Sequence, residues 1–396
     1  MTDQSAKTEQ QRSVDIISGT TGKPISNSRR RFLTNAGMFS AGLVGSSLLA
    51  ACSDNDGFAN AQTDNAGNND LFANAPSDAA VLQFALNLEY LEAEYYLGAV
   101  TGSGLKAPDT SGSEGGMSAG TVTFPQQGGV NFNLQGQADP LIGRYAAEIA
   151  SDELDHVQFL RAGLSQAGGL IARPTINLSS SFDFAATAAL RAAGVIGNNA
   201  TATFNPYASP LGFLIGAFIF EDVGVTAYKG GAQFLRNRDF LTAAAGILSV
   251  EGYHAGLVRT ILTARAEDGE TVTFNTSEGD QTVPLGAVIN AISGARDSLD
   301  GDDDLDQGIT GDGVNSVSIY GTNYDATNIV PTDGNGITFS RTPAQIHNIA
   351  YLTPNSVSPM ANNVPSTSFF PEGTNIAAAE ALEASGGATQ SSNTTS

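Results

Sequence analysis

The chain has 396 residues, 41% of them hydrophobic, so it is long enough to bury one large core or two modest ones. Its 40 acidic and 18 basic residues give a formal charge of −22, which repels phosphate backbones, so no nucleic-acid partner is expected. The single cysteine, Cys52, excludes disulfides within the chain and cysteine-rich zinc or iron–sulfur sites.

The N-terminal region, residues 1–52, has the features of an export signal. Arginines at residues 29–31 precede a short apolar segment, residues 36–51, whose small residues lead directly into Cys52. This order resembles a bacterial twin-arginine signal that ends in a lipoprotein box. We therefore expect export of the folded chain to the periplasmic face, with lipidation of Cys52 as its only membrane attachment. Because Ser53 follows the cysteine, the outer membrane is the expected destination. The alternative is an N-terminal anchor that is never cleaved.

A flexible tether and four long helices are predicted next along the chain. Residues 53–76 are rich in Asn, Asp, Ala and Gly, a composition typical of a flexible linker. The apolar spacing that follows predicts a helical domain over residues 77–267. Its first helix starts after Pro76 and continues past Tyr96. The other three helices are predicted over residues 140–167, 210–231 and 238–266. Past the N-terminal region we expect no apolar run of about 18 residues, which argues against a membrane-spanning helix in the mature protein.

The four helices carry the residue types of a site for two metal ions. The second and fourth each contain Glu-x-x-His, which places a carboxylate and an imidazole on one face of one helical turn. Two of the chain's three histidines occupy these motifs, and the first and third helices each supply one glutamate. This ligand set is the one known from ferritin-like di-iron and di-manganese proteins. The predicted metal ligands are Glu89, Glu153, His156, Glu221, Glu251 and His254.

Charge and ligand chemistry limit which ions are expected. Four carboxylates neutralise two divalent ions, whereas four unpaired carboxylates in a core would be prohibitively costly. Mixed carboxylate and imidazole ligands suit iron or manganese, and zinc less well. We therefore expect two ions of iron or manganese.

The two halves of the helical domain repeat each other. Aligning Glu89 with Glu221 places Tyr96 opposite Tyr228, so each glutamate is followed seven residues later by a tyrosine. These tyrosines are the candidate catalytic residues, as hydrogen-bond donors to the ligands or as electron carriers, although ordinary core tyrosines are equally consistent with the pattern. Glu92 is the reserve ligand on the first helix, because the same alignment places Gly224 opposite it.

Two aspartates are candidate partners of the ligand imidazoles. Asp152 and Asp222 each adjoin a predicted ligand glutamate in the sequence. A carboxylate at such a position can accept a hydrogen bond from a metal-bound histidine and orient its ring. A solvated helix face is the preferred interpretation for both.

A loop-rich extension is predicted over residues 268–376, followed by a disordered tail over residues 377–396. Short helices are expected near residues 285–298 and 342–352. The segment from Asp297 to Asp312 contains seven aspartates, and such oxygen ligands suit calcium. It lacks the spacing and the terminal glutamate of a helix–loop–helix calcium site, so a solvated acidic loop is the preferred interpretation.

Two further segments resemble known families. Asn87-Leu88-Glu89, with Tyr96 and Leu97 after it, resembles the first helix of ferritins. The Gly-rich insert after this helix, and the sequence from Ser340 to Gln345, are similar to those of the ferritin-like desiccation-related proteins. The resemblance covers roughly residues 76–375. It implies an all-α, ferritin-like four-helix bundle with a long, loop-rich C-terminal extension. The chain lacks the Cys-x-x-Cys pairs of the electron-donating domain found in rubrerythrins.

We expect an exported dimetal-carboxylate protein that acts as an oxidoreductase on peroxide or oxygen in stress protection. Manganese would favour disproportionation of hydrogen peroxide, which needs no external electron donor, and iron would favour oxidase or peroxidase chemistry. One alternative is a non-enzymatic desiccation or stress protein of the envelope whose dimetal site is structural. Another is an iron-binding ferroxidase, for which the C-terminal extension fits poorly with a closed storage cage. A homo-oligomer is compatible with the sequence.

Overall fold

The structure, a computed structural model, describes residues 77–112, 118–125, 140–167, 169–301, 303–311, 316–354 and 364–375. The predicted signal with Cys52, the predicted tether and the predicted C-terminal tail lie outside these described residues.

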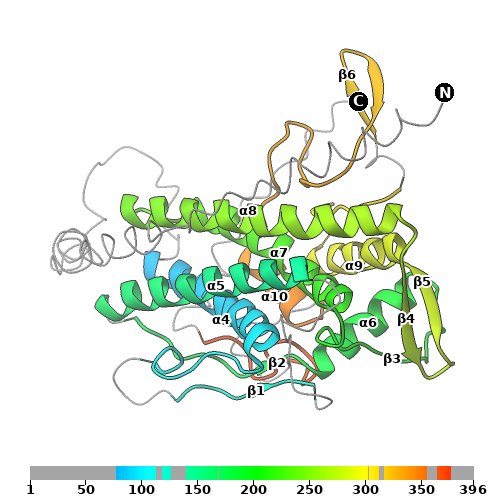
Figure 1. Ribbon diagram of the computed structural model, residues 1–396. Helices are drawn as coiled ribbons and strands as arrows, with labels where there is room; N and C mark the ends of the chain where they lie inside the picture. Colours follow the sequence, from blue (N-terminus) through cyan, green and yellow to red (C-terminus); the bar gives the residue numbers. More distant parts are fainter. Residues whose placement is uncertain are drawn as a thin grey trace, which may run out of the picture. The chain divides into compact units, whose positions relative to one another are not determined.

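Four long helices form the bundle that the sequence predicts. The hairpin of α4 and α5 packs on the hairpin of α7 and α8 through contacts of α4 with α7 and of α5 with α8 (Figure 1). Each helix agrees with its predicted range within a few residues. The four helices are α4 (Asp78–Thr101), α5 (Pro140–Gln166), α7 (Pro210–Ala232) and α8 (Arg238–Glu267). The fold class, an all-α bundle with a loop-rich C-terminal part, is confirmed.

Local capping explains where these helices start. The side chain of Ser77 accepts a hydrogen bond from the amide of Ala80, and that of Ser209 accepts one from the amide of Gly212. At the start of α8, the Asn237 side chain accepts hydrogen bonds from the amides of Asp239 and Phe240. Such caps satisfy amides that have no partner within the helix, and each typically contributes about 1 kcal/mol.

Helix α7 is the apolar centre of the bundle. It is long and apolar enough to cross a membrane by composition, with a mean hydropathy of 1.5, so the expectation that no such run exists was wrong. However, 89% of that apolar window is buried inside the protein. Because the surrounding helices already cover it, α7 is accounted for as a core helix.

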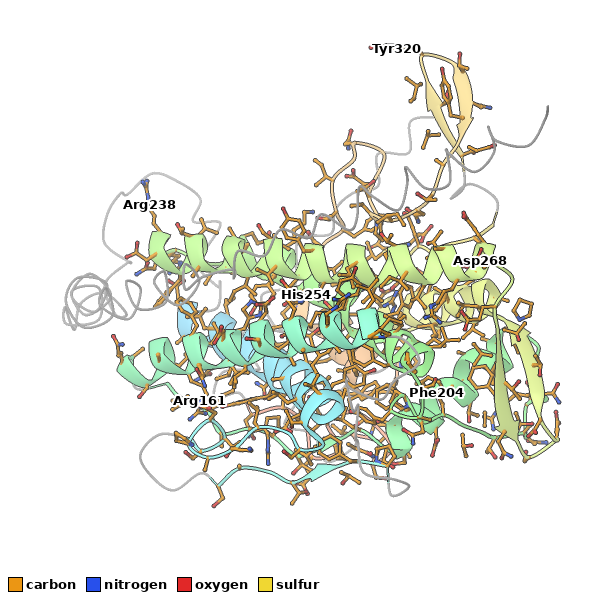
Figure 2. All side chains as sticks on the ribbon, viewed as in Figure 1. Arg161, Phe204, Arg238, His254, Asp268 and Tyr320 are labelled. Carbon is orange, nitrogen blue, oxygen red and sulfur yellow. The ribbon has the colours of Figure 1, made fainter. Side chains whose placement is uncertain are left out.

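Besides the four long helices, the described residues contain a further helix and several short strands that the sequence pattern did not predict. Helix α6 (Ser180–Ala192) packs against α9 (Leu285–Asp300). Strands β1 (Val122–Thr123) and β2 (Ile176–Asn177) pair in parallel. A three-stranded antiparallel sheet has the order β3, β4, β5, and a separate hairpin joins β6 to β7. These strands are β3 (Ala202–Thr203), β4 (Thr271–Thr276), β5 (Gln281–Pro284), β6 (Ser316–Ile319) and β7 (Thr322–Asp325). Figure 2 shows Tyr320 at the turn of the last hairpin, fully exposed.

A buried network of arginines and aspartates joins the C-terminal extension to the bundle. Arg341, which precedes α10 (Pro343–Ala350), donates from Nε to Asp300 over 2.7 Å and also pairs with Asp306. Arg296 of α9 pairs with the same Asp306 and, over 2.9 Å, with Asp222 of α7. Side chains from three separate segments are thereby held together in the core.

This network corrects the interpretation of the acidic segment. Asp300 and Asp306 are 2% and 7% exposed and are paired with arginines, so this part of the segment is not a solvated loop. Neither aspartate is available as a calcium ligand. Within the described residues, neither of the two acid and histidine clusters contains an aspartate of this segment. Asp302 and Asp312 lie outside the described residues.

Candidate metal centre

The six predicted ligands meet in the middle of the bundle. Helices α4 and α7 supply one glutamate each, and α5 and α8 supply one Glu-x-x-His each. The four carboxylates are at most 1% exposed, and the two imidazoles are 5% and 8% exposed. Figure 2 shows His254 about midway along α8, on the side that faces α5. Helical spacing therefore brings together residues that lie far apart in the chain.

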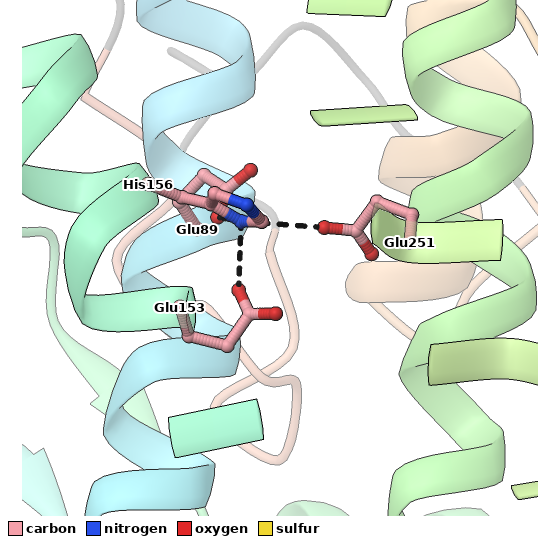
Figure 3. A group of neighbouring side chains, drawn as sticks. All are labelled: Glu89, Glu153, His156 and Glu251. Atoms are coloured by element: carbon pink, nitrogen blue, oxygen red, sulfur yellow. Dashed lines mark hydrogen bonds and ion pairs between the residues drawn. The ribbon is translucent and has the colours of Figure 1, made fainter. Parts of the chain in front are cut away.

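The first metal position is formed by Glu89, Glu153, His156 and Glu251 (Figure 3). Nδ1 of His156 lies 3.2 Å from Oε2 of Glu89. The same nitrogen lies 3.6 Å from Oε2 of Glu153 and 3.6 Å from Oε1 of Glu251. One imidazole nitrogen thus faces carboxylates from three different helices.

The second metal position is formed by Glu221, Glu251 and His254, with Glu153 beside them. Nδ1 of His254 lies 3.1 Å from Oε1 of Glu153 and 3.6 Å from Oε2 of Glu221. Glu153 therefore turns one oxygen toward each histidine, and Glu251 belongs to both clusters. This arrangement suits two ions bridged by Glu153 and Glu251.

In the described part of the chain, several buried carboxylate oxygens of the centre lack hydrogen-bond partners, and a bound cation would satisfy them. Within the described residues, neither carboxylate oxygen of Glu153 or Glu251 has a hydrogen-bond partner, and the same holds for Oε2 of Glu221. Buried acceptors without partners are costly unless a proton, a water or an ion satisfies them. Oxygen and imidazole donors at this spacing suit two transition-metal ions. The cluster therefore fits a dimetal site.

Electrostatics lead to the same conclusion. Burial raises the pKa of Glu89 to about 7 and that of Glu221 to about 8, and it also raises the pKa of Glu251. Burial acts in the same direction on Glu153, but attraction from the two histidines beside its carboxylate outweighs burial and lowers the pKa of Glu153 to about 2. Without a metal, protons must therefore neutralise much of the cluster, and binding a metal would release them.

The histidines keep their protons in the metal-free cluster. Burial lowers the pKa of both imidazoles, but the surrounding carboxylates outweigh this effect. The charge of Glu89 and contacts with Glu153 raise the pKa of His156 to about 11. The charge of Glu221 and bonds to neighbouring acids raise that of His254 to about 10. A metal ion at either position would replace such a proton.

The two candidate catalytic tyrosines contact the ligands across the bundle. Tyr96 of α4 donates a hydrogen bond to Glu221 of α7, and Tyr228 of α7 donates one to Glu89 of α4. Each phenol thus holds the terminal carboxylate of the opposite half. The predicted hydrogen bonds are present, and a catalytic role for the tyrosines stays a prediction.

The two aspartates next to the ligands have different partners. Asp152 lies 3.3 Å from Nε2 of His254, the nitrogen that points away from the centre, so it is placed to orient this ring. Asp222 does not contact an imidazole. It accepts hydrogen bonds from Arg259 of α8 and from Arg296 of α9, each over 2.9 Å. The preference for a solvated face is wrong for Asp222, which is 8% exposed.

A fifth carboxylate, that of Glu92, adjoins the six ligands. Its side chain is 4% exposed, and the charges of the neighbouring ligand carboxylates help burial to raise its pKa. A methyl group at Gly224 would lie 2.6 Å from Oε2 of Glu251 and 3.2 Å from Oε1 of Glu92. From the sequence, Glu92 was only a reserve for Glu89, whereas the structure buries both side chains. A sequence signal for the burial of Glu92 was Gly224, which stands opposite Glu92 when the two halves are aligned and leaves room for its side chain.

A separate cavity lies away from this cluster. It has a volume of about 120 Å³ and lies between α6 and α9, with Phe182, Phe204 and Val288 among its mainly apolar walls. None of the six ligands lines it. We place the chemistry at the buried cluster, because the ionisable groups and the unsatisfied polar atoms are there.

Comparison with known proteins agrees with this geometry. The profile of a ferritin-like domain matches residues 77–264, from the cap of α4 to near the end of α8. The chain is 28% identical to "Ferritin-like catalase Nec2" of Nesocodon mauritianus over 347 residues, 87% of this chain and 96% of that protein. It is 27% identical to "Desiccation-related protein PCC13-62" of Craterostigma plantagineum over 272 residues, 67% of this chain and 75% of that protein. No solved structure gives a significant match.

Proposed function

Because the chain belongs to the ferritin-like superfamily and to the desiccation-related proteins within it, we propose that it is a dimetal enzyme that disproportionates hydrogen peroxide. The reaction converts two molecules of peroxide into two of water and one of oxygen. The observation that carries the proposal is the convergence of four buried carboxylates and two imidazoles, with two of the carboxylates shared between two metal positions.

Manganese is the proposed metal, for two reasons. The reaction oxidises one peroxide molecule and reduces another, so it needs no external reductant, and the chain has no cysteine pairs for an electron-donating domain. The relative from Nesocodon mauritianus is named a catalase, which supports the same chemistry here. When bound, the two ions would take up two electrons from one peroxide molecule and return them to another.

The protein's own residues hold and shield such a centre. Glu153 and Glu251 would bridge the ions, and Glu89 and Glu221 would each bind one of them. The phenols of Tyr96 and Tyr228 fix the positions of these terminal carboxylates. Because the four carboxylates are buried, bulk water does not screen their charges, and their electrostatic effect on a bound substrate is stronger.

A structural role is the second candidate, and the burial of the site favours it. The most exposed ligand, His156, is only 8% exposed, and metal binding can contribute folding energy without any turnover. In that case the ions would neutralise the carboxylates and brace the four helices in desiccated or stressed cells.

Metal analysis combined with an oxygen assay separates these functions. The full chain is expressed with manganese or with iron, its bound metal is measured by mass spectrometry, and oxygen release from peroxide is followed with an electrode. Bound manganese with oxygen release supports the proposal. Tightly bound metal without release supports the structural role, and release only by iron-loaded protein with an added reductant supports a peroxidase.

Glu251→Gln tests whether the oxygen release comes from this centre. It should abolish release, whereas Glu267→Gln, an exposed glutamate on the same helix, should leave it unchanged. Release that persists in Glu251→Gln would mean that the activity arises elsewhere.

We further propose that the protein is exported and anchored through a lipid on Cys52. The support is the sequence pattern of residues 28–52 alone. Mass spectrometry of protein from the membrane fraction should find an acylated N-terminal cysteine, and Cys52→Ala should move the protein to the soluble fraction. An unmodified, uncleaved N-terminus in membrane-bound protein would favour the uncleaved anchor instead.

A further inference from the structure

A small cavity lies beside Glu92, on the side of the bundle covered by the C-terminal extension, and none of the six ligands lines it. Its walls include Leu91 and Glu92 of α4, Val223 and Gly224 of α7, and Ile349 and Ala350 of α10. The volume open to the centre of a water-sized sphere is about 30 Å³. One water molecule needs about 10–15 Å³ by this measure, so the cavity has room for a molecule the size of hydrogen peroxide.

Glu92 gives this cavity its one polar side chain. The other side chains along its walls are aliphatic or aromatic. In the part of the chain that the structure describes, no hydrogen-bond donor pairs with the Glu92 carboxyl, although the residue is only 4% exposed. A buried carboxyl group without a partner is costly, which indicates that it binds something small in the working protein.

Gly224 keeps Glu92 in reach of the metal cluster. A side chain at this position would meet both the Glu92 carboxylate and Oε2 of Glu251. With glycine there, the two carboxylates lie next to each other, and Glu251 belongs to both metal positions. A molecule bound to Glu92 would therefore lie beside the metal cluster.

The extension holds the third wall in place. The amide of Arg341 donates to the carbonyl of Thr226 on α7 over 3.1 Å, and the guanidinium of Arg341 donates to the Thr226 hydroxyl over 3.0 Å. Thr342 and Gln345 then form a capping box that starts α10. These contacts fix Ile349 and Ala350 over the gap between α4 and α7.

We propose that this cavity is the substrate site and that Glu92 is the substrate-binding residue, which hydrogen-bonds a small uncharged molecule of the peroxide class. The apolar walls disfavour ions, and the nearby carboxylates repel anions in particular. The choice of peroxide rests on the proposed function, whereas occupancy of the cavity does not require turnover. The C-terminal extension is then part of the active site, because α10 closes it.

Crystals of zinc-loaded protein test occupancy without turnover, since zinc has no redox chemistry. Crystals of the full chain are soaked in hydrogen peroxide. In the wild type, density for a small molecule should appear within hydrogen-bond distance of Glu92. Ala350→Leu fills the cavity from α10 and should remove this density. Ala189→Leu, the same substitution in the separate cavity between α6 and α9, should retain it. An empty cavity in the wild type would overturn the proposal.

Kinetics of manganese-loaded variants test the role of Glu92. Glu92→Leu and Ala350→Leu should raise KM for peroxide roughly tenfold or more while the bound metal stays at the wild-type level. Loss of metal from Glu92→Leu would make Glu92 a metal ligand and contradict a substrate-binding role. Wild-type KM in both variants would overturn the site and leave the catalase proposal standing. Peroxide density at Glu92 in a protein without turnover would overturn the catalase and leave the site standing.

Discussion

The α4–α5 and α7–α8 halves of the bundle carry equivalent ligands in different surroundings. In both halves an arginine of the Glu-x-x-His helix reaches the residue that follows the single glutamate. Arg161 donates to the phenol of Tyr90 in one half, and Arg259 donates to the carboxylate of Asp222 in the other. Asp222 also binds an arginine of the extension, Arg296.

The comparison separates the ligand pattern from its surroundings. The ligands are equivalent in the two halves, since each half supplies one single glutamate and one Glu-x-x-His, as a pair of metal positions would require. Their surroundings differ because each half packs against a different part of the chain. Arg161 also donates to the carbonyls of Pro108 and Ser111, whereas Arg259 donates to carbonyls of the extension. A repeated helix hairpin has thus been adapted to two sets of neighbours.

The largest effect should come from removing a shared ligand. Glu153 faces both histidines, so Glu153→Gln should lose both ions, whereas Glu89→Gln or Glu221→Gln should weaken mainly one position. Mass spectrometry of the native protein measures the metal content, with Glu267→Gln as the control. Equal losses from Glu153→Gln and Glu89→Gln would show that the two halves do not bind independently.

The second effect compares the two arginine contacts. Asp222→Ala leaves Arg259 and Arg296 buried without this carboxylate, and breaking such a buried pair costs about 3–5 kcal/mol. Tyr90→Phe removes the hydrogen bond from Arg161 and the one that Tyr90 donates to the carbonyl of Ile171, and should cost only about 2 kcal/mol. Denaturant unfolding of both variants measures the difference. Equal costs would mean that the extension adds little to the α7–α8 half.

The third effect is a dependence of stability on pH in the metal-free protein. Glu89 and Glu221 have folded pKa values of about 7 and 8, above the value of 4.5 for a free glutamate. Their contribution to stability is therefore complete below pH 4.5 and is lost as the pH rises through these values. The melting temperature should fall by roughly 5 °C or more between pH 5 and pH 8.

Variants and added metal sharpen this pH test. Glu221→Gln should reduce the fall in melting temperature up to about pH 8, and Glu89→Gln should reduce it up to about pH 7. Added manganese should stabilise the wild type more at pH 8 than at pH 5, because it competes with protons for the cluster. A metal-free melting temperature that rises over this range would contradict the protonated cluster.

The smallest effect concerns the outer partner of one histidine. Asp152→Asn weakens the contact with Nε2 of His254. It should lower metal affinity at the His254 position by about tenfold. This is the smallest loss expected for a residue that orients a metal-binding histidine, because the Asp152 carboxylate is partly exposed. Its counterpart in the aligned halves is Val250, so Val250→Ala should leave the affinity at His156 unchanged. Competitive titration with a chelator measures both.

The centre was predictable because its signal is local in each helix. A Glu-x-x-His motif lies within one helical turn, so its two side chains share a face however the helices pack. The capping residues Ser77, Ser209 and Asn237 likewise act on amides a few positions away. The choice between Glu89 and Glu92 was harder, since both lie on one side of α4 and both are buried.

Helical periodicity, caps and charge balance in the sequence determined the four helices and the six converging ligands. Only the tertiary structure showed that Asp222 pairs with arginines, that Asp300 and Asp306 are buried, and that α10 closes a cavity at Glu92. These contacts join segments dozens of residues apart. No local spacing encodes them, because the partner of a buried charge or the wall of a cavity depends on how distant segments pack.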